Sequence, residues 1–106
     1  MSEISTKINP ILQSDDIVLF MKGTPDMPAC GFSATVAQIF KLLNVSVTGV
    51  NILEDEEIRA DMKVFSNWPT FPQVYVKGEF VGGCDIIRDM YEEGELKTLL
   101  QEKGVL

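Results

Sequence analysis

The sequence predicts an α/β fold in which a four-stranded mixed sheet is flanked by helices on both faces. Helix-like and strand-like segments follow one another in the order α, β, α, β, α, β, β, α, α, and strands joined by a helical crossover are expected to be parallel. Near residue 78 two strand-like segments are separated by a short turn, which is typical of an antiparallel hairpin. A chain of 106 residues is expected to form one domain, residues 1–106, around a single core.

The first half of the chain is predicted to form a helix, a strand, a helix and a strand. Apolar residues at helical spacing predict a short opening helix, with Ser2 or Ser5 as its cap. Residues 17–21 are apolar on both alternating faces, which predicts a central strand covered on both sides. A second helix is expected to end near Asn44, and the β-branched segment 45–53 predicts the next strand. The apolar positions of the two helices are Ile4, Ile8, Ile11 and Leu12, then Phe32, Val36, Ile39, Phe40 and Leu43.

The second half is predicted to form a helix, the hairpin and two further helices. Three consecutive acidic residues from Asp55 predict the start of the third helix. The stretch 68–72 breaks the helical pattern, and the hairpin strands are expected at 73–76 and 80–81. Helical spacing then returns and is interrupted at Gly94. The apolar positions of these helices are Ile58, Met62 and Phe65, then Ile86, Ile87, Met90 and Tyr91, then Leu96, Leu99 and Leu100.

Composition argues against two classes of partner. Lysine and arginine total 9 against 16 aspartate and glutamate, a net charge of −7, which disfavours a protein that binds by neutralising nucleic-acid phosphates. The longest apolar run, residues 17–21, is far too short to span a membrane, and the N-terminal residues lack the layout of a signal peptide. We therefore expect no nucleic acid and no membrane partner, and a protein that is cytoplasmic or the matured form of an organellar one.

Histidine is absent, which removes Cys–His nucleophilic pairs, His-ligated zinc and general base catalysis by histidine. The two cysteines, Cys30 and Cys84, lie in a chain without secretory features, so a disulfide framework is not expected. Each thiol is therefore judged by its own surroundings.

Cys30 is the strongest candidate for a reactive residue. It precedes the predicted second helix, where the positive end of the helix dipole and free backbone N–H groups favour the thiolate. Lys22, at the end of the central strand, is the cation expected to reach the same place. The alternative is a small, buried, apolar cysteine. Pro28, Ala29 and Gly31 around it indicate instead a tight, exposed turn.

Ser33 stands where a redox dithiol motif has its second cysteine. A hydroxyl cannot resolve a mixed disulfide, so Cys30, acting as an oxidant, needs an outside thiol to complete each cycle. The alternative is that Ser33 is only a helix-start residue bonded to nearby backbone.

Together these residues resemble the monothiol glutaredoxins with a Cys-Gly-Phe-Ser active site. The resemblance rests on four blocks that agree in order and spacing and span most of the chain. They are Met21-Lys22-Gly23-Thr24, Pro28-Ala29-Cys30-Gly31-Phe32-Ser33, Trp68-Pro69-Thr70-Phe71-Pro72-Gln73 and Gly82-Gly83-Cys84-Asp85. The resemblance implies a thioredoxin-like fold with Pro72 in the cis form next to Cys30, and a glutathione bound along the groove between these blocks.

Glutathione has two carboxylates, and the resemblance implies which residues meet them. Lys22 and Arg59 look like partners for the glycine end. The backbone N–H groups of Cys84 and Asp85, at the start of a helix, suit the γ-glutamyl end. Phe71 would pair its backbone with that of the glutathione cysteine, as in strand addition.

Each of these residues also has a purely structural interpretation. Arg59 on its own is typical of a solvated helix charge paired with a neighbouring acid. Trp68 and Phe71 are typical of loop or core packing. Three interpretations of the Cys84 side chain stay open: a resolving thiol, a regulatory thiol or an inert thiol. The resemblance implies only the contact between the Cys84 backbone and glutathione.

A 2Fe-2S cluster usually takes four thiolate ligands, and one chain offers only Cys30 at the expected site. The resemblance implies that two chains each give Cys30 and that two glutathione thiols complete the set, so that the cluster joins a homodimer and is easily passed on. The first hypothesis is therefore a carrier that accepts a 2Fe-2S cluster from an iron-sulfur scaffold and transfers it to apo-protein clients.

The second hypothesis is an enzyme, a glutathione-dependent thiol-disulfide oxidoreductase that removes glutathione from protein thiols through Cys30. The long loop at 23–29 and the missing second thiol lead us to expect at most weak activity of this kind. A third hypothesis is a regulatory complex with a BolA-type partner, which no residue of the sequence tests.

Overall fold

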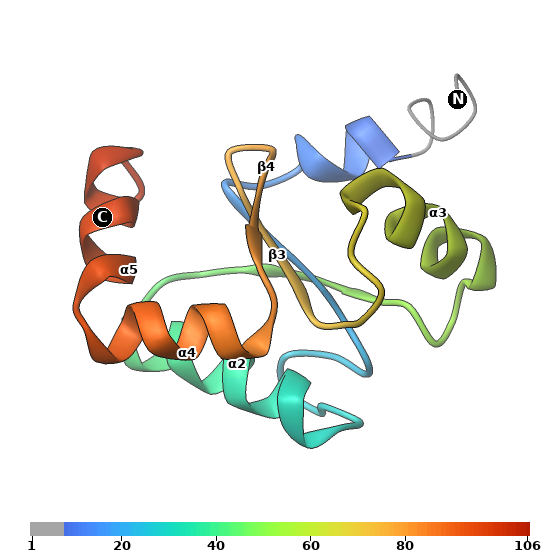
Figure 1. Ribbon diagram of the computed structural model, residues 1–106, viewed down its shortest axis with the longest axis horizontal. Coiled ribbons are helices and arrows are strands. Elements are labelled where there is room, and N and C mark those ends of the chain that lie inside the picture. Colours follow the sequence, from blue (N-terminus) through green and yellow to red (C-terminus); the bar gives the residue numbers. More distant parts are fainter. Residues whose placement is uncertain (1–7) are drawn as a thin grey trace.

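The computed structural model describes residues 8–106, and its element order is the predicted one. Residues 8–12 are helical, while the predicted positions Ile4, Ser2 and Ser5 lie outside the described residues. Eight further elements follow, drawn in Figure 1: β1 (Ile17–Met21), α2 (Gly31–Leu42), β2 (Thr48–Asn51), α3 (Glu56–Ser66), β3 (Gln73–Val76), β4 (Glu79–Gly82), α4 (Cys84–Glu92) and α5 (Glu95–Glu102).

The predicted four-stranded mixed sheet is confirmed. Its strand order is β2-β1-β3-β4, with β1 parallel to β2 and antiparallel to β3, and β3 antiparallel to β4. All five residues of β1 are buried, as expected for a strand covered on both faces. The β1 strand therefore ends, at Met21, in the middle of the sheet rather than at an edge.

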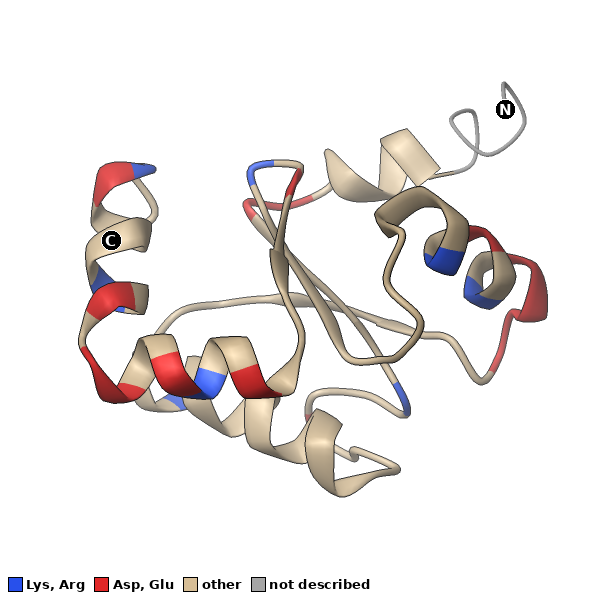
Figure 2. Ribbon diagram, viewed as in Figure 1, with Lys and Arg blue, Asp and Glu red and all other residues tan. Residues whose placement is uncertain are grey.

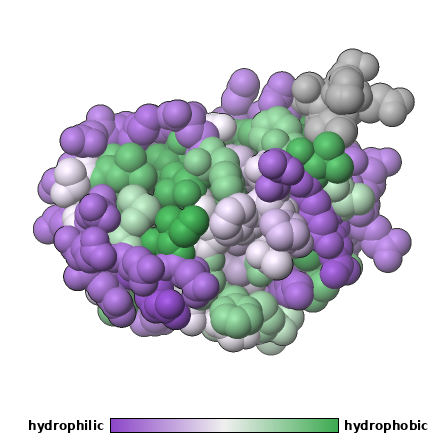
Figure 3. Space-filling model, in the orientation of Figure 1, coloured by the Kyte–Doolittle hydropathy of each residue, from purple (hydrophilic) through white to green (hydrophobic). Residues whose placement is uncertain are grey.

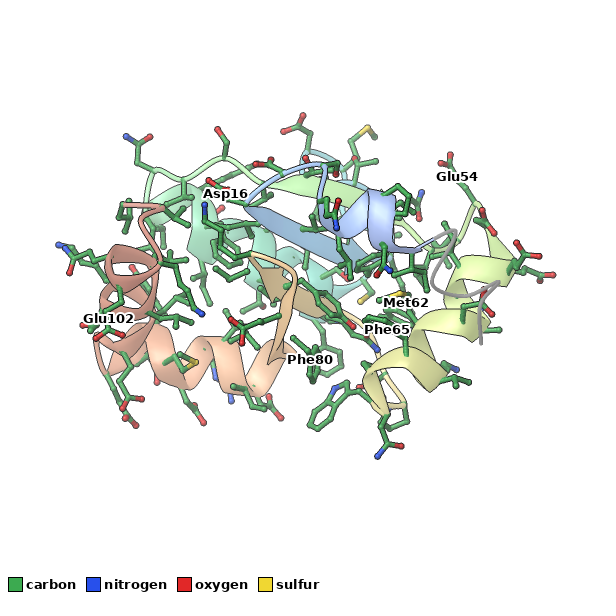
Figure 4. The ribbon with its side chains drawn as sticks, turned by 90° about the horizontal axis from the view of Figure 1, so that it is seen from above. Asp16, Glu54, Met62, Phe65, Phe80 and Glu102 are labelled. Atoms are coloured by element: carbon green, nitrogen blue, oxygen red, sulfur yellow. The ribbon has the colours of Figure 1, made fainter. Side chains whose placement is uncertain are left out.

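Helices cover both faces of the sheet, as predicted (Figure 1). Alternate residues of β1 point to opposite faces, so Leu19 packs with α2, α4 and α5 in one core, and Phe20 packs with α3 and residues 8–12 in the other. Met62 and Phe65 project from α3 toward the sheet (Figure 4). None of the helices within residues 8–106 is long and apolar enough to cross a membrane.

The hairpin is closed by two residues with positive φ, Lys77 at 52° and Gly78 at 83°. These angles are those of the type I′ turn, whose twist matches that of paired strands. Glu79, which the sequence places in the turn, is the first residue of β4.

Three sequence-based expectations are wrong in part. The second strand is Thr48–Asn51 rather than 45–53, because the Val45 N–H still bonds to the Phe40 carbonyl at the end of α2 and only four residues pair with β1. Phe32, expected in the apolar stripe of α2, is 63% exposed. Phe65 contacts the Tyr75 ring at 6.3 Å but remains 40% exposed.

Candidate functional site

Cys30 is the N-cap residue of α2, as its place in the sequence predicts. Its backbone is extended, and its sulfur accepts a hydrogen bond from the Ser33 N–H at 3.4 Å. An N-cap side chain normally offers an oxygen to these free N–H groups. Here the acceptor is a sulfur, so the start of the helix directly stabilises negative charge on Cys30.

Ser33 connects Cys30 to the end of the central strand. Its side chain is fully buried, and its hydroxyl oxygen accepts a hydrogen bond from the Lys22 N–H at 3.1 Å. The same oxygen lies 3.6 Å from the Cys30 sulfur. Because the oxygen is already an acceptor from Lys22, the hydroxyl hydrogen is available to the sulfur when Cys30 is ionised. Both interpretations of Ser33 therefore hold: it bonds to nearby backbone and it touches the reactive sulfur.

The surroundings of Cys30 lower the pKa of its thiol. Partial burial opposes ionisation, but hydrogen bonds from the Ser33 N–H, the Ser33 hydroxyl and the Phe32 N–H outweigh it, and the Lys22 charge adds a smaller effect in the same direction. Cys30 is only partly buried, so the small buried cysteine is not what the structure shows.

The loop between β1 and Cys30 is closed by its own backbone. The Ala29 N–H bonds to the Lys22 carbonyl at 2.8 Å, and Thr24 and Met27 bond to each other in both directions at 3.1 Å. Gly23 has a φ of 87°, and a Cβ there would lie 2.5 Å from the Met27 oxygen. The loop thus returns the chain to the end of β1, which places Cys30 beside Lys22.

A cavity of about 510 Å³ lies next to Cys30. Its lining comes from five places: the end of β1, the start of α2, one face of α3, the loop before β3 and the start of α4. Figure 3 shows apolar and pale side chains in the middle of this side of the molecule, with hydrophilic side chains over α3 and α4 on either side. The residues named for a ligand by sequence, Lys22, Arg59, Phe71, Cys84 and Asp85, all line this cavity.

The loop before β3 forms the floor of the cavity. The Phe71–Pro72 peptide bond is cis, as the resemblance implies. The Phe71 side chain is buried in the core on the α3 side of the sheet, which confirms the packing interpretation for that side chain. Within residues 8–106 no hydrogen bond uses the Phe71 backbone, so its N–H and C=O remain available to a ligand.

The start of α4 forms the opposite wall. Its N-cap is Gly83, which has no side chain to satisfy the first N–H groups of the helix, so those at Cys84 and Asp85 are free to bind an anion. A Cβ on Gly83 would lie 3.1 Å from the Trp68 indole nitrogen and 3.2 Å from the Pro72 oxygen. Glycine therefore lets α4 approach the loop closely. The buried indole nitrogen itself has no hydrogen-bond partner in the described chain.

Cys84 is buried, and its surroundings raise the pKa of its thiol. Burial is the main cause, and the Asp85 charge adds to it, while Arg88 partly offsets the increase. Charge on Cys30 also raises the pKa of the Cys84 thiol, as the smallest of these contributions. Both cysteines are free thiols in this structure.

The structure also brings to the site residues that the sequence-based prediction missed. Lys63 lines the cavity one helical turn after Arg59, and Phe32 lines it instead of packing in the core. The spacing of four from Arg59 on α3 was the available indication for Lys63. Cys30 itself is beside the cavity rather than in its lining. Among residues 8–106 no three Cys, Asp or Glu lie close enough together to hold a metal ion.

Comparison with known proteins supports the resemblance. Residues 17–81 match the family model for glutaredoxin. The chain is 50% identical over 93% of its length to a probable monothiol glutaredoxin 2 of Rickettsia typhi, of which it covers 89%, and 53% identical over 94% of its length to the chloroplastic monothiol glutaredoxin-S14 of Arabidopsis thaliana, of which it covers 58%.

A solved structure agrees with these relatives. The solution structure of reduced poplar apo GrxS14 matches with a TM-score of 0.84 at 50% identity, covering 94% of this chain and 92% of that one. The predicted thioredoxin-like fold is confirmed by this match.

Proposed function

The chain belongs to the monothiol glutaredoxins, and on this premise we propose that it binds glutathione and carries a 2Fe-2S cluster that it delivers to apo-proteins. One observation carries the proposal. The described chain places Cys30, a thiol of lowered pKa, beside a cavity lined by three cations, and it offers no group of three side chains that could hold a metal ion.

The cavity suits glutathione because its two walls differ in charge. Lys22, Arg59 and Lys63 form the cationic wall, which is complementary to the glycine carboxylate. The opposite wall offers the free N–H groups at the start of α4 and the exposed Asp85 carboxylate. These groups are complementary to the γ-glutamyl end, which has both a carboxylate and an ammonium group. The unbonded Phe71 backbone lies between the two walls, where the cysteine of the tripeptide would extend.

The number of thiols decides what the site does with glutathione. Since a 2Fe-2S cluster takes four thiolates, Cys30 and one glutathione thiol supply half of the set, and a second copy of the same assembly supplies the rest. We therefore propose a homodimer that forms around the cluster, with Cys30 as its protein ligand. A 2Fe-2S cluster that is held partly by exchangeable glutathione dissociates easily. A carrier between an iron-sulfur scaffold and apo-protein clients requires this property.

The lowered pKa of Cys30 favours one alternative, a glutathione-dependent oxidoreductase. In that reaction the Cys30 thiolate attacks the glutathione sulfur of a protein–glutathione disulfide and releases the protein thiolate. A second glutathione thiolate then attacks the Cys30–glutathione disulfide, which releases oxidised glutathione and regenerates Cys30. Ser33 cannot replace that second glutathione, so we propose that this activity is weak. A BolA-type partner and a cytoplasmic location complete the proposal.

Anaerobic reconstitution with iron, sulfide and glutathione tests the carrier function. We expect visible absorbance of a 2Fe-2S cluster and a shift to a dimer in size-exclusion chromatography, both dependent on glutathione. Cys30→Ser should lose both signals completely, whereas Cys84→Ser, as the matched control, should retain them. Cluster binding by Cys30→Ser would refute the ligand assignment. A colourless wild-type protein that rapidly reduces a glutathione mixed disulfide would favour the enzyme instead.

A further inference from the structure

Gln73 is a buried polar residue that lies outside the lining of the cavity. It is the first residue of β3, where it pairs with Phe20 of the central strand, and its side chain is fully buried. A primary amide inside a protein is costly unless its groups are hydrogen-bonded. The Gln73 amide nitrogen donates to the Trp68 carbonyl and to the Thr70 carbonyl, each at 3.2 Å. The amide therefore ties β3 to two points of the loop that precedes it.

These two bonds hold the loop before β3 by its carbonyls. Among the described residues, no other hydrogen bond reaches a carbonyl of the loop 68–72. Phe71 lies between Thr70 and Gln73, inside the ring that the bond to Thr70 closes, and its own backbone N–H and C=O are unbonded there. The direction in which the Phe71 backbone is presented to the cavity thus depends on Gln73.

The Tyr75 hydroxyl fixes the orientation of the Gln73 amide. It donates a hydrogen bond to the Gln73 oxygen at 3.1 Å. Burial raises the pKa of Tyr75 to about 12, against the effect of a hydrogen bond with Ser66, so the hydroxyl keeps its proton at neutral pH. A rotated amide would place its oxygen against the two loop carbonyls, acceptor against acceptor. Ser66 in turn accepts a hydrogen bond from the Trp68 N–H at 3.1 Å, so one network fixes both ends of the loop.

The loop has no charged residue of its own. Figure 2 shows the segment between α3 and β3 without Lys, Arg, Asp or Glu (tan), whereas α3 and α4 carry charged residues. A ligand that meets this segment therefore meets backbone groups and uncharged side chains. A backbone hydrogen bond weakens steeply when its angle is poor. Unlike an ion pair between exposed charges, it is not screened by salt. Binding at the loop is thus sensitive to the position of the loop and insensitive to salt.

We propose that Gln73 is a positioning residue for the ligand: it holds the loop so that the Phe71 backbone is aligned with the peptide backbone of glutathione, and Tyr75 holds Gln73 in place. The inference rests on the proposed binding of glutathione. Neither side chain lines the cavity, so both act through the loop. The alternative is a network that only stabilises the fold. That alternative predicts equal binding of glutathione by all variants of equal stability.

The test measures the dissociation constant of glutathione, from amide chemical shifts, for wild type and three variants whose stabilities are compared by urea denaturation. Gln73→Met keeps the length of the side chain without its donors, and Tyr75→Phe removes one hydroxyl and keeps the ring. Val18→Ala is the matched control, because Val18 is buried opposite Tyr75 in the same core but has no polar side-chain atom.

We expect Gln73→Met to bind glutathione about tenfold more weakly, which corresponds to the loss of about two hydrogen bonds to the Phe71 backbone. The loss should be the same at low and at high salt. Tyr75→Phe should bind about threefold more weakly, and Val18→Ala should bind as wild type does. Alkylation of Cys30 by iodoacetamide should be equally fast in all four proteins, because the groups that lower the pKa of Cys30 lie on α2 and at Lys22.

Two results would overturn the inference while leaving the proposed function intact. In the first, Gln73→Met binds glutathione as tightly as Val18→Ala does. In the second, the loss of affinity is accompanied by an equal loss of Cys30 alkylation, which would show a general loosening of the site. If Gln73→Met does not fold, wild-type affinity in Tyr75→Phe overturns the inference instead. Failure of wild type to bind glutathione would contradict the proposed function, and the inference with it.

Discussion

Cys30 and Cys84 both stand at the start of a helix, yet their thiols are shifted in opposite directions. The pKa of Cys30 is lowered, and the pKa of Cys84 is raised. Cys30 is the N-cap of α2, and its sulfur lies where the Ser33 N–H can reach it. Cys84 is the first residue inside α4, where Gly83 is the cap and no hydrogen bond reaches the Cys84 sulfur from the described residues. Of these two sulfurs, the one in the capping position accepts a hydrogen bond from the helix start, and the pKa of that thiol is the lowered one.

The neighbours of the two cysteines strengthen this difference. Cys30 has Lys22 nearby, whose charge favours the thiolate. Cys84 is buried next to Asp85, whose charge opposes it. The site thus holds one thiol whose ionisation its neighbours favour and another whose ionisation they oppose.

The largest expected consequence is a difference in reactivity. At pH 7 we expect iodoacetamide to alkylate Cys30 at least about tenfold faster than Cys84, because the thiolate is the nucleophile and Cys30 is also less buried. The alkylation rate of Cys30 should reach half of its maximum at a pH below the pKa of an ordinary thiol. The alkylation rate of Cys84 should reach half of its maximum at a pH above that pKa. Mass spectrometry of peptides after timed alkylation measures both rates in one sample. Equal rates, or a faster Cys84, would contradict the comparison.

Ser33→Ala tests whether hydrogen bonds to the sulfur are the cause. It removes the hydroxyl between Cys30 and the Lys22 N–H, so the pKa of Cys30 should rise, and the free energy of unfolding should fall by about 1–3 kcal/mol because a buried donor loses its acceptor. The pH dependence of Cys30 alkylation and urea denaturation measure the two effects. Ser33→Thr, which keeps a hydroxyl, is the control. An unchanged alkylation profile in Ser33→Ala would assign the acidity to the backbone N–H groups alone.

The smallest expected change comes from charge. Lys22→Gln should raise the pKa of Cys30 less than Ser33→Ala does, since Lys22 makes the smallest of the contributions that lower it. The effect should shrink as salt is added, because screening weakens a charge interaction and leaves the hydrogen bonds intact. Lys41→Gln, at a cation already paired with Asp26, is the matched control. A larger increase in the pKa of Cys30 in Lys22→Gln than in Ser33→Ala would show that the Lys22 charge, and not the Ser33 hydroxyl, is the stronger cause.

Much of the fold was predictable because its determinants are local. Strand β1 is apolar on both faces, α3 begins at an acidic cap, and the hairpin turns at Lys77 and Gly78. Each follows from the conformational preferences of a few adjacent residues. The length of β2 was not predictable in this way, because the β-branched residues of 45–53 favour a strand throughout. Only pairing with β1 limits the strand to Thr48–Asn51.

The candidate site was predictable in its motif and less so in its surroundings. The structure brings Cys30, at the start of α2, close to the residues that the resemblance names as glutathione ligands. The individual roles of these residues remain predictions. Phe32 matches the apolar stripe of α2 by spacing, but it lies in the first turn, beyond the edge of the core, and lines the cavity. In the sequence Lys63 cannot be distinguished from an ordinary surface lysine. Its place at the cavity follows only from the packing of α3 near the loop before β3.

The amino-acid sequence by itself determined the order of helices and strands, the position of Cys30 before a helix and the single thiol of its motif, because periodicity, capping and turn chemistry act between residues close along the chain. Only the tertiary structure decided that Cys84 differs from Cys30 in acidity, that Phe32 is exposed and that three cations share one cavity. Burial and electrostatic fields depend on which surfaces meet, and those surfaces come from segments far apart in the sequence.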